Sequence, residues 1–234
     1  MALDGRLPPI CILAGGRGTR LGDLTAETPK PLLAVAGRPF LEHVLNALAA
    51  AGADEVVIST GYLAEQFAST IGDGSRFGLR VTYVEDGDEP AGTAGGVRNC
   101  LPLLGSRFIV MYGDSFLRAD PRNVVAQHLR GGRLGTMAVL PGAIAPELPN
   151  CRVEGDAVVE YAKRPVPPDA THIDYGMLVF ERQAFDDFTG SDLSDLQALL
   201  ARTGRLTACV VQEPYIEIGT PEALAAADRK IGSG

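Results

Sequence analysis

The stretch PICILAGGRGTRLGDLTAETPKP, residues 9–31, places a glycine-rich segment directly after an apolar run. The apolar part, residues 9–14, predicts a buried strand. The glycines that follow leave backbone N–H groups free of side-chain obstruction, so phosphate oxygens can approach them closely. Taken alone, such a segment is as typical of a structural turn as of an anion site.

Two cations favour the anion site. Arg20 and Lys30 flank the glycines, and Lys30 stands between Pro29 and Pro31, whose fixed φ restricts where the ammonium can point. Arginine offers a planar fork for two phosphate oxygens, whereas lysine offers a compact point charge. The two cations together could therefore hold a triphosphate along its length.

Outward from this stretch, apolar spacing predicts strands that alternate with helices. A helix over residues 38–52 is expected to have Pro39 at its first position. Then follow strand 55–60, helix 63–72, strand 79–86, helix 95–104 and strand 107–114. The order βαβαβαβ predicts an α/β fold, a Rossmann-like three-layer sandwich with a mostly parallel, mixed central sheet, whose ligand sites lie at the carboxyl ends of the strands.

The pattern changes after about residue 131. Shorter strands with turns are expected within residues 135–142, 151–165 and 173–181, where they add a small β lobe that forms one wall of a cleft. Two helices follow, over residues 194–204 and 220–231. The second has Thr220 as its expected N-cap and Pro221 at its first position.

Charge and hydropathy exclude several partners. With 21 Lys and Arg against 29 Asp and Glu, the 234-residue chain has a formal net charge of −8, which opposes a general attraction to nucleic acid or to an anionic membrane. The apolar runs are far shorter than the roughly 20 residues of a membrane span, and the first residues lack the apolar region of a signal peptide. We expect a cytoplasmic protein without a nucleic-acid or membrane partner.

Cysteine and glycine spacing exclude other sites. The four cysteines are far apart, which fits neither a zinc site nor a C-x-x-C redox motif, so free thiols that are buried or partly buried are expected. The glycine-rich segment lacks the G-x-x-x-x-G-K-[ST] of a P-loop. Leu21 stands where a dinucleotide fingerprint requires its third glycine, which disfavours a nicotinamide-dependent oxidoreductase.

Asp114 follows Gly113 at the end of the expected strand 107–114. A carboxylate at that place faces the crevice rather than the core, and Mg²⁺ prefers such oxygen ligands. The alternative is that Asp114 caps the turn or helix that begins in residues 115–121. The residues alone leave both interpretations open.

These motifs jointly resemble the sugar-1-phosphate nucleotidylyltransferases, also called nucleoside-diphosphate-sugar pyrophosphorylases. GGRGTRL (15–21) and PKP (29–31) are similar to the opening G-G-x-G-T-R-L and P-K-P of that family. AGTAGGVR (91–98) resembles its nucleotide-base loop, YGDS (112–115) its G-D metal motif, AKRP (162–165) its E-K-P and EIGTPEAL (217–224) its D-I-G-T-P. The resemblance spans residues 13 to about 224 and is strongest to the short heptose- and mannose-1-phosphate guanylyltransferase-like members.

The resemblance implies a Mg²⁺-dependent reaction in which a sugar 1-phosphate attacks the α-phosphorus of a nucleoside triphosphate and releases pyrophosphate. Phosphoryl-type transfer asks mainly for positioning and charge neutralisation. By resemblance, Arg20 would hold the departing phosphates, Lys30 the α-phosphate, Asp114 the Mg²⁺ and Lys163 the phosphate of the sugar, the first three being the catalytic residues. The other implied nucleotide-binding residues are Leu13, Ala14, Gly15, Gly16, Gly18, Thr19, Ala91, Gly92 and Thr93.

The chain departs from the family pattern at two kinds of site. Glu217, the implied second metal carboxylate, stands where Asp is commoner, and an alternative is that Asp114 and water carry most of the coordination. Ala162 replaces a frequent Glu, so a contact to a sugar hydroxyl is expected from Glu160 or Tyr161 instead. IDYG, residues 173–176, replaces a frequent N-A-G and makes Asp174 a candidate acceptor for a sugar hydroxyl.

By resemblance, residues 1–234 form a single nucleotidyltransferase domain. Residues 1–130 are its nucleotide-binding core, 131–220 its sugar-phosphate-binding part with the second metal carboxylate, and 221–234 a C-terminal helix. No β-helix domain for acetyl transfer is expected after residue 224.

The expected product is of the GDP-heptose or GDP-mannose type, a precursor of cell-surface polysaccharide. The alternatives are uridylyl, thymidylyl or cytidylyl transfer to another sugar phosphate or to phosphocholine, and a non-catalytic sensor of nucleotide or sugar phosphate. The oligomeric state is left open, a homo-oligomer included.

Overall fold

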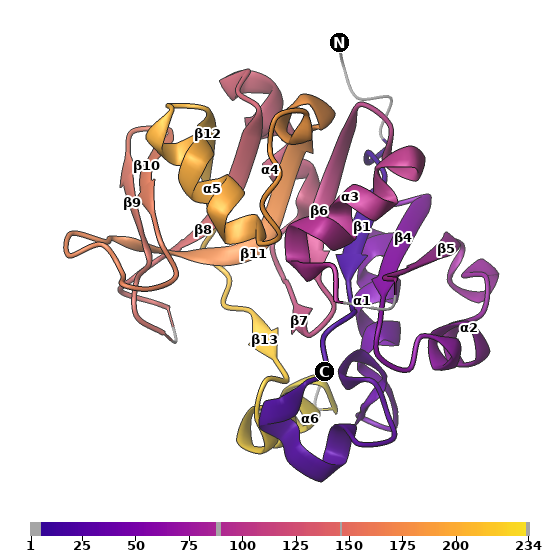
Figure 1. Cartoon of the computed structure of the whole chain (residues 1–234). Coiled ribbons are helices and arrows are strands. Elements are labelled where there is room, and N and C mark those ends of the chain that lie inside the picture. Colours follow the sequence, from indigo (N-terminus) through magenta and orange to yellow (C-terminus); the bar gives the residue numbers. More distant parts are fainter. Residues whose placement is uncertain (1–5, 88–89, 146, 233–234) are drawn as a thin grey trace.

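The computed structural model describes residues 6–87, 90–145 and 147–232, and a nine-stranded sheet runs through them (Figure 1). In spatial order the strands are β5 (Arg80–Glu85), β4 (Glu55–Thr60), β1 (Ile10–Leu13), β6 (Arg107–Tyr112), β11 (His172–Glu181), β8 (Gly135–Pro141), β12 (Leu206–Val210), β10 (Ala157–Tyr161) and β9 (Cys151–Glu154). The four strands from β5 to β6 are parallel, β11 runs antiparallel to β6 and β8, and β12 is parallel to β8. The predicted α/β fold with a mixed sheet is confirmed.

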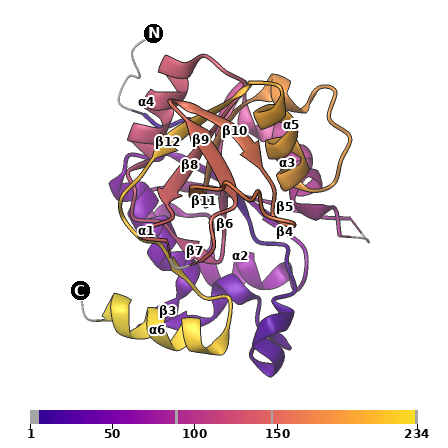
Figure 2. The ribbon, with the colours of Figure 1, turned by 90° about the vertical axis from the view of Figure 1, so that its left-hand side faces the viewer.

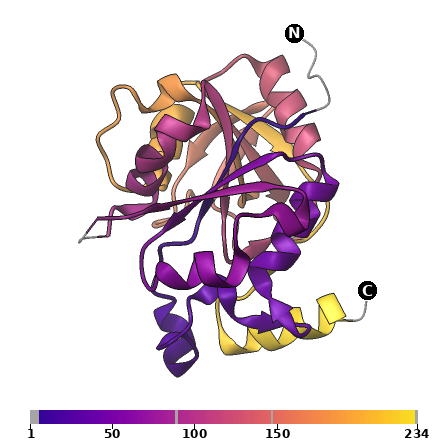
Figure 3. The same ribbon diagram turned by 90° about the vertical axis from the view of Figure 1, so that its right-hand side faces the viewer.

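Helices cover both faces of this sheet (Figures 2 and 3). The helices are α1 (Phe40–Ala50), α2 (Glu65–Ile71), α3 (Gly92–Leu104), α4 (Pro121–Gly131), α5 (Leu193–Arg202) and α6 (Pro221–Gly232). Successive side chains of a strand point to opposite faces. Ile10 and Ile12 of β1 therefore pack in a core cluster with Leu41 of α1, whereas Cys11 packs with Val97 of α3 in the cluster of the other face.

The starts of several helices differ from those expected, and α1 and α3 show the physical reasons. Pro39 directly precedes α1 instead of being its first residue. Helix α3 begins at Gly92 rather than near residue 95, because the chain around Ser191 packs against its first turn. The Ala94 N–H donates to the Ser191 carbonyl at 2.8 Å. Gly92 has φ +73°, and an added Cβ would lie 2.4 Å from that carbonyl oxygen, so the position requires glycine.

Two short two-stranded ribbons lie below the sheet, and the first of them connects remote parts of the chain. Strand β7 (Ser115–Phe116) pairs antiparallel with β13 (Ile216–Glu217), and β2 (Ala34–Val35) pairs with β3 (Arg38–Pro39). Helix α6 follows β13 (Figure 1), and the Thr220 hydroxyl accepts from the Ala223 N–H at 3.2 Å, which confirms the predicted cap. Residues 233–234 of the predicted C-terminal helix lie outside the described residues.

The cysteines are free thiols, as predicted: Cys11, Cys100 and Cys151 are buried and Cys209 is half-buried. Among the described residues, no helix combines the length and the apolar composition needed to cross a bilayer.

Candidate active site

A cavity of about 370 Å³ opens at the carboxyl ends of the parallel strands, where ligands bind in open α/β sheets. It is lined by Leu13, Ala14, Gly15, Gly16, Gly18, Thr19, Arg20, Lys30, Pro31, Ser59, Asp86, Pro90, Gly92, Thr93, Tyr112, Asp114 and Gly219. Every predicted nucleotide-binding residue except Ala91 is in this set, and so is Asp114. Ala91 immediately precedes α3, and an added Cβ at Gly95 would lie 2.8 Å from the Ala91 Cβ.

The glycine-rich segment folds back on itself around Gly18. That residue has φ +64°, and an added Cβ would lie 3.0 Å from Thr25 Cγ2 and 3.2 Å from Lys30 Cβ. The Thr25 hydroxyl lies 3.2 Å from the Gly18 carbonyl, to which it donates, and the Leu21 N–H donates to the same oxygen at 2.9 Å. This packing leaves Thr19 and Arg20 exposed at the cavity.

Lys30 and Asp114 form an ion pair. Lys30 is only 7% exposed, and its Nζ donates to Asp114 Oδ2 at 2.6 Å. Asp114 comes from the turn after β6, whereas Lys30 begins a 3₁₀ turn between two prolines. The structure thus places the predicted metal carboxylate against the predicted α-phosphate cation. Asp114 does not cap α4. Asp120 is the N-cap of that helix, and its carboxylate accepts from the Arg122 N–H at 2.9 Å.

Glu217 reaches the same place from the far end of the chain. It pairs with Ser115 across the β13–β7 ribbon, and the Ile218 N–H donates to the Asp114 carbonyl at 3.1 Å. Burial raises the pKa of Glu217. The negative charges of Glu147 and Asp114 raise it further, whereas the positive charges of Lys30 and Arg20 act to lower it. Two carboxylates therefore face one region that holds two cations.

The donor set at this place suits a hard divalent cation. Among the described residues, no group of three or more His, Cys, Asp or Glu gathers in a metal-binding arrangement. Mg²⁺ is commonly held by one or two carboxylates, with water and substrate phosphates completing its shell. The carboxylates of Asp114 and Glu217 meet that requirement, and a cation between them would offset the repulsion that raises the pKa of Glu217.

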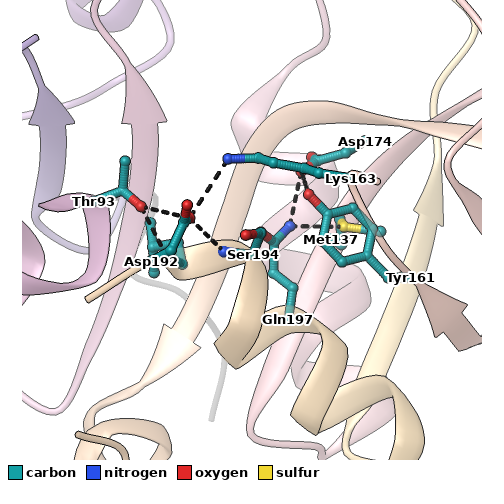
Figure 4. A network of polar contacts seen from close by, with 9 residues as sticks. Thr93, Met137, Tyr161, Lys163, Asp174, Asp192, Ser194 and Gln197 are labelled. Carbon is teal, nitrogen blue, oxygen red and sulfur yellow. Dashed lines mark hydrogen bonds and ion pairs between the residues drawn. The ribbon is translucent and has the colours of Figure 1, made fainter. Parts of the chain in front are cut away.

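Asp192 connects the start of α3 to the start of α5 (Figure 4). Its Oδ1 accepts from the Thr93 hydroxyl at 2.9 Å and from the Ser194 N–H at 3.0 Å, while the Leu193 N–H donates to Thr93 Oγ1 at 2.8 Å. Lys163 Nζ approaches the same carboxylate at 3.5 Å. Burial acts to raise the pKa of Asp192, but these donors outweigh it and lower the pKa.

Asp174 lies at the centre of a second polar cluster (Figure 4). Its Oδ2 accepts from Gln197 Nε2 at 2.8 Å and from the Tyr161 hydroxyl at 3.3 Å, and its Oδ1 from the Gly176 N–H at 2.9 Å. Burial raises the pKa of Asp174, although these donors and Lys163 act to lower it. The carboxylate is thus fixed in place without a direct ion pair among the described residues.

Two buried polar atoms next to these carboxylates have no hydrogen-bond partner among the described residues, namely the Tyr112 hydroxyl and Gln197 Oε1. Burial raises the pKa of Tyr112, and so do Asp174, Asp192 and Asp114. Because the ring of Tyr112 also lines the cavity, this side chain connects the cavity to the cluster around Asp174. An unsatisfied buried polar atom is costly, and a polar ligand can provide the missing partner.

Glu160 does not join this cluster. It is exposed and lies 3.7 Å from Arg152, whereas its neighbour Tyr161 is buried against Asp174. Of the alternatives Glu160 and Tyr161, the structure brings only Tyr161 to the cluster around Asp174. Sequence reasoning missed Ser59, Asp86, Tyr112, Asp192 and Gln197. Two of these residues had a signal. Asp86 ends the expected strand 79–86 just as Asp114 ends the expected strand 107–114, and Asp192 stands close before the predicted helix 194–204, where an N-cap is typical.

Comparisons with known proteins agree with this geometry. The family model described as nucleotidyl transferase matches residues 10–233. A mannose-1-phosphate guanylyltransferase of Mycobacterium tuberculosis is 37% identical over 178 residues, which cover 75% of this chain and 49% of that protein. An N-acetylmuramate alpha-1-phosphate uridylyltransferase of Neisseria meningitidis is 48% identical over 113 residues, 47% of this chain and 48% of that protein. The chain spans about half the length of these curated relatives.

Solved structures share the fold. A Bacillus anthracis protein, provisionally described as a glucose-1-phosphate thymidylyltransferase, superposes with a TM-score of 0.85 over 97% of this chain and 96% of that chain, at 23% identity. HddC from Yersinia pseudotuberculosis, solved in complex with GMP-PN, gives a TM-score of 0.80 over 96% of this chain and 100% of that chain, also at 23% identity. At this level of identity the likeness supports the fold alone.

Proposed function

The chain belongs to the nucleotidyl transferase family, and from that membership we propose that it joins a nucleoside triphosphate to a sugar 1-phosphate, giving a nucleoside-diphosphate sugar and pyrophosphate. One observation carries the proposal. A single cavity combines exposed glycine-loop backbone, Arg20, and the Lys30–Asp114 pair with Glu217 beside it. This arrangement suits in-line attack of one phosphate on another, because the main requirements are positioning and charge neutralisation.

The roles follow from the positions around the cavity. The backbone from Leu13 to Thr19 holds the triphosphate, and exposed Arg20 binds the β- and γ-phosphates that leave as pyrophosphate. Lys30 supports the α-phosphate, where negative charge builds up during attack. The attacking sugar phosphate is already an anion at neutral pH, so no side chain has to remove a proton from it.

The Lys30–Asp114 pair must change when substrate binds. In the structure described here each group neutralises the other at 2.6 Å. Phosphate oxygens can replace Asp114 as the partner of the buried ammonium, which frees the carboxylate. Asp114 and Glu217 would then hold Mg²⁺, which supplies charge stabilisation for the phosphates.

The sugar phosphate binds in the part of the chain between residues 131 and 220. Lys163 is exposed beside the cavity, and its one ion pair among the described residues is a 3.5 Å contact to Asp192, so its ammonium can turn to a phosphate. Asp174 offers a fixed carboxylate for sugar hydroxyls. The nearby Tyr112 hydroxyl and Gln197 Oε1, for which the described part of the chain offers no hydrogen-bond partner, can complete that contact.

For the product we propose a GDP-heptose or GDP-mannose type of compound. The mycobacterial guanylyltransferase supports this choice, since its match covers three quarters of the chain. The uridylyltransferase from Neisseria meningitidis has the higher identity over a shorter match, which makes UTP with N-acetylmuramate 1-phosphate the second pair to test.

A pyrophosphate-release screen tests the proposal. Four or five nucleoside triphosphates are combined with a panel of sugar 1-phosphates, including heptose, mannose, glucose and N-acetylmuramate 1-phosphates, with Mg²⁺. We expect release with at least one pair, with the sugar phosphate and the nucleotide both required. Nucleotide binding without release from any pair would favour the non-catalytic sensor instead.

A further inference from the structure

The turn between β4 and α2 lies against the start of the glycine-rich segment. The Ala14 N–H donates to the Ser59 carbonyl at 2.8 Å, which continues the pairing of β1 with β4. Just beyond, an added Cβ at Gly61 would lie 2.9 Å from the Gly15 carbonyl oxygen and 3.2 Å from the Gly15 Cα. Backbone therefore packs directly on backbone where the glycine-rich segment leaves the sheet.

Two side chains that follow this turn hold the later part of the segment. The Tyr62 hydroxyl donates to the Ala26 carbonyl at 2.6 Å, and Gln66 Nε2 donates to the Glu27 carbonyl at 2.8 Å. The guanidinium of Arg17 lies over the Tyr62 ring, with its Cζ 5.7 Å from the ring centroid. A cation at that distance is attracted by the face of the ring. Tyr62 thus contacts the segment both before and after the point where it folds back.

The backbone of the turn is strained. Leu63 has φ +55°, in the left-handed region that a bulky side chain seldom occupies. Its carbonyl accepts from the Gln66 N–H at 3.1 Å, so the turn leads directly into α2. Such a conformation costs free energy and persists only where the surrounding structure holds it. The chain thus keeps an unfavourable conformation where Tyr62 and Gln66 contact the glycine-rich segment.

These contacts lie outside the cavity but act on its wall. Tyr62 and Arg17 are not among the residues that line the cavity, whereas Gly15, Gly18 and Arg20 are. Backbone N–H groups bind an anion well only when several of them point toward it together. A segment that is held in this arrangement before binding loses less conformational entropy when the ligand arrives.

We propose that Tyr62 is a positioning residue for the departing phosphates of the nucleotide, an inference that rests on the nucleotidyl-transfer function proposed above. Its ring holds Arg17 and its hydroxyl holds Ala26, so the backbone between these residues keeps the shape that lines the cavity. The α-phosphate depends instead on Lys30, which its two neighbouring prolines restrain. Loss of Tyr62 therefore weakens the binding of the β- and γ-phosphates more than that of the α-phosphate.

Calorimetry with Tyr62→Leu tests this difference, with Mg²⁺ and without any sugar phosphate. The probes are whichever of ATP, CTP, GTP, UTP and dTTP binds the unaltered chain most tightly, and the monophosphate of the same nucleoside. We expect the variant, which loses ring and hydroxyl, to bind the triphosphate about tenfold more weakly and the monophosphate within about twofold of the unaltered chain. Tyr62→Phe keeps the ring and should recover part of the loss. Unchanged triphosphate affinity in Tyr62→Leu overturns the inference.

Tyr83→Phe is the matched control. The Tyr83 hydroxyl also donates to a backbone carbonyl at 2.6 Å, that of Gly72 at the other end of α2. Its removal loosens the same helix without touching the glycine-rich segment, so the ratio of triphosphate to monophosphate affinity should stay as in the unaltered chain. A loss of triphosphate affinity equal to that of Tyr62→Phe would assign the effect to α2 as a whole and contradict the inference.

Arg17→Met tests the contact from the other side. Arg17 is exposed, so this variant decides even if Tyr62→Leu prevents folding, and it should weaken the triphosphate several-fold. Because the two side chains contact each other, the free-energy losses of Arg17→Met and Tyr62→Leu should add incompletely in the double variant. Fully additive losses would mean that Arg17 binds phosphate by itself, which contradicts the role of the Tyr62 ring.

A purely structural role for Tyr62 predicts something else. In that case Tyr62→Leu lowers thermal stability and weakens triphosphate and monophosphate by one common factor, and this result contradicts the inference. In steady-state turnover we expect the KM for the triphosphate to rise about tenfold and the KM for the sugar phosphate to stay unchanged. A triphosphate-selective loss with no pyrophosphate release from the unaltered chain leaves the inference standing and overturns the proposed function, whereas turnover that Tyr62→Leu does not affect does the reverse.

Discussion

The glycine-rich end of the site lines the cavity and comes from one continuous stretch, residues 13–31. The Asp174 end, a polar cluster that reaches the cavity through Tyr112, is assembled from four elements. Its central side chains come from β6, β10, β11 and α5, and they are Tyr112, Tyr161, Asp174 and Gln197. The first end is rich in backbone N–H groups and cations. The second combines one carboxylate with two hydroxyls and an amide, and two of its polar atoms have no partner among the described residues.

This difference indicates that the two ends recognise different parts of the substrates. Backbone N–H groups and cations recognise phosphate in any nucleotide, so the continuous stretch can serve a general purpose. Hydroxyl and amide groups held by several elements recognise the pattern of hydrogen-bonding groups on one ligand. We therefore expect changes at the glycine-rich end to affect chemistry and nucleotide binding, and changes around Asp174 to affect the acceptor sugar.

The largest effect is expected from Asp114→Ala, at the junction of the two ends. Loss of this carboxylate should lower kcat at least about 1000-fold, because the metal and the buried Lys30 both lose their partner. Pyrophosphate release measures the effect, and circular dichroism checks that the chain still folds. Asp120→Ala is the control: it removes the N-cap of α4, outside the cavity, and costs about 1 kcal/mol of stability without loss of kcat. Near-normal turnover in Asp114→Ala contradicts the metal assignment.

Asp174→Asn should have the next largest effect, confined to the acceptor. The amide keeps the shape but removes the charge that Gln197 and Tyr161 orient. We expect the KM for the sugar phosphate to rise about 10- to 100-fold, with little change in nucleotide affinity. Steady-state kinetics with each substrate varied in turn provides the measurement. A matching loss of nucleotide affinity would remove the distinction between the two ends.

Glu217 should make the metal-free protein sensitive to pH. Its pKa is raised above the ordinary 4.5 in the folded chain by burial, Glu147 and Asp114. The folded state therefore binds a proton more tightly than the unfolded state, so stability falls as the pH rises through the raised pKa. Thermal unfolding from pH 4.5 upward, with a chelator, should show this loss, and Mg²⁺ or Glu217→Gln should reduce it. Identical pH profiles for both chains contradict the carboxylate pair.

Tyr112→Phe is expected to have the smallest effect. It removes a buried hydroxyl that has no partner among the described residues, so stability should stay level or rise by about 1 kcal/mol. If the hydroxyl contacts the acceptor, kcat/KM for the sugar phosphate falls several-fold while nucleotide affinity is unchanged. Unchanged kinetics with every sugar phosphate that reacts would assign Tyr112 to the cavity wall alone.

The sequence predicted the glycine-rich end well because its chemistry is local. A strand, its glycines, Arg20 and Lys30 are close in the chain, so turn geometry and proline restraint already bring them together. Asp114 was predictable for a similar reason, since a buried strand ends just before it. The roles of these residues in a reaction remain proposals.

The other end could not be predicted to the same extent. Whether Glu160 or Tyr161 faces inward depends on a shift of register between β9 and β10, at Val158 to Glu160, which alternation along the strand does not show. Gln197 is a single amide in the predicted helix 194–204, and Asp86 is one of several acidic residues within 85–89. They become site residues only because α5 packs over β10 and because β5 ends beside the glycine loop.

Paired substitutions at the two ends test most directly whether the nucleotide and the sugar phosphate are bound by separate parts of the site. Arg20→Ala, Lys163→Ala and the exposed-lysine control Lys230→Ala are compared by steady-state pyrophosphate release and by nucleotide-binding calorimetry. We expect Arg20→Ala to weaken nucleotide binding and to lower kcat, and Lys163→Ala to raise only the KM for the sugar phosphate, by about tenfold. Loss of nucleotide affinity in Lys163→Ala equal to that in Arg20→Ala would contradict two ends with separate functions.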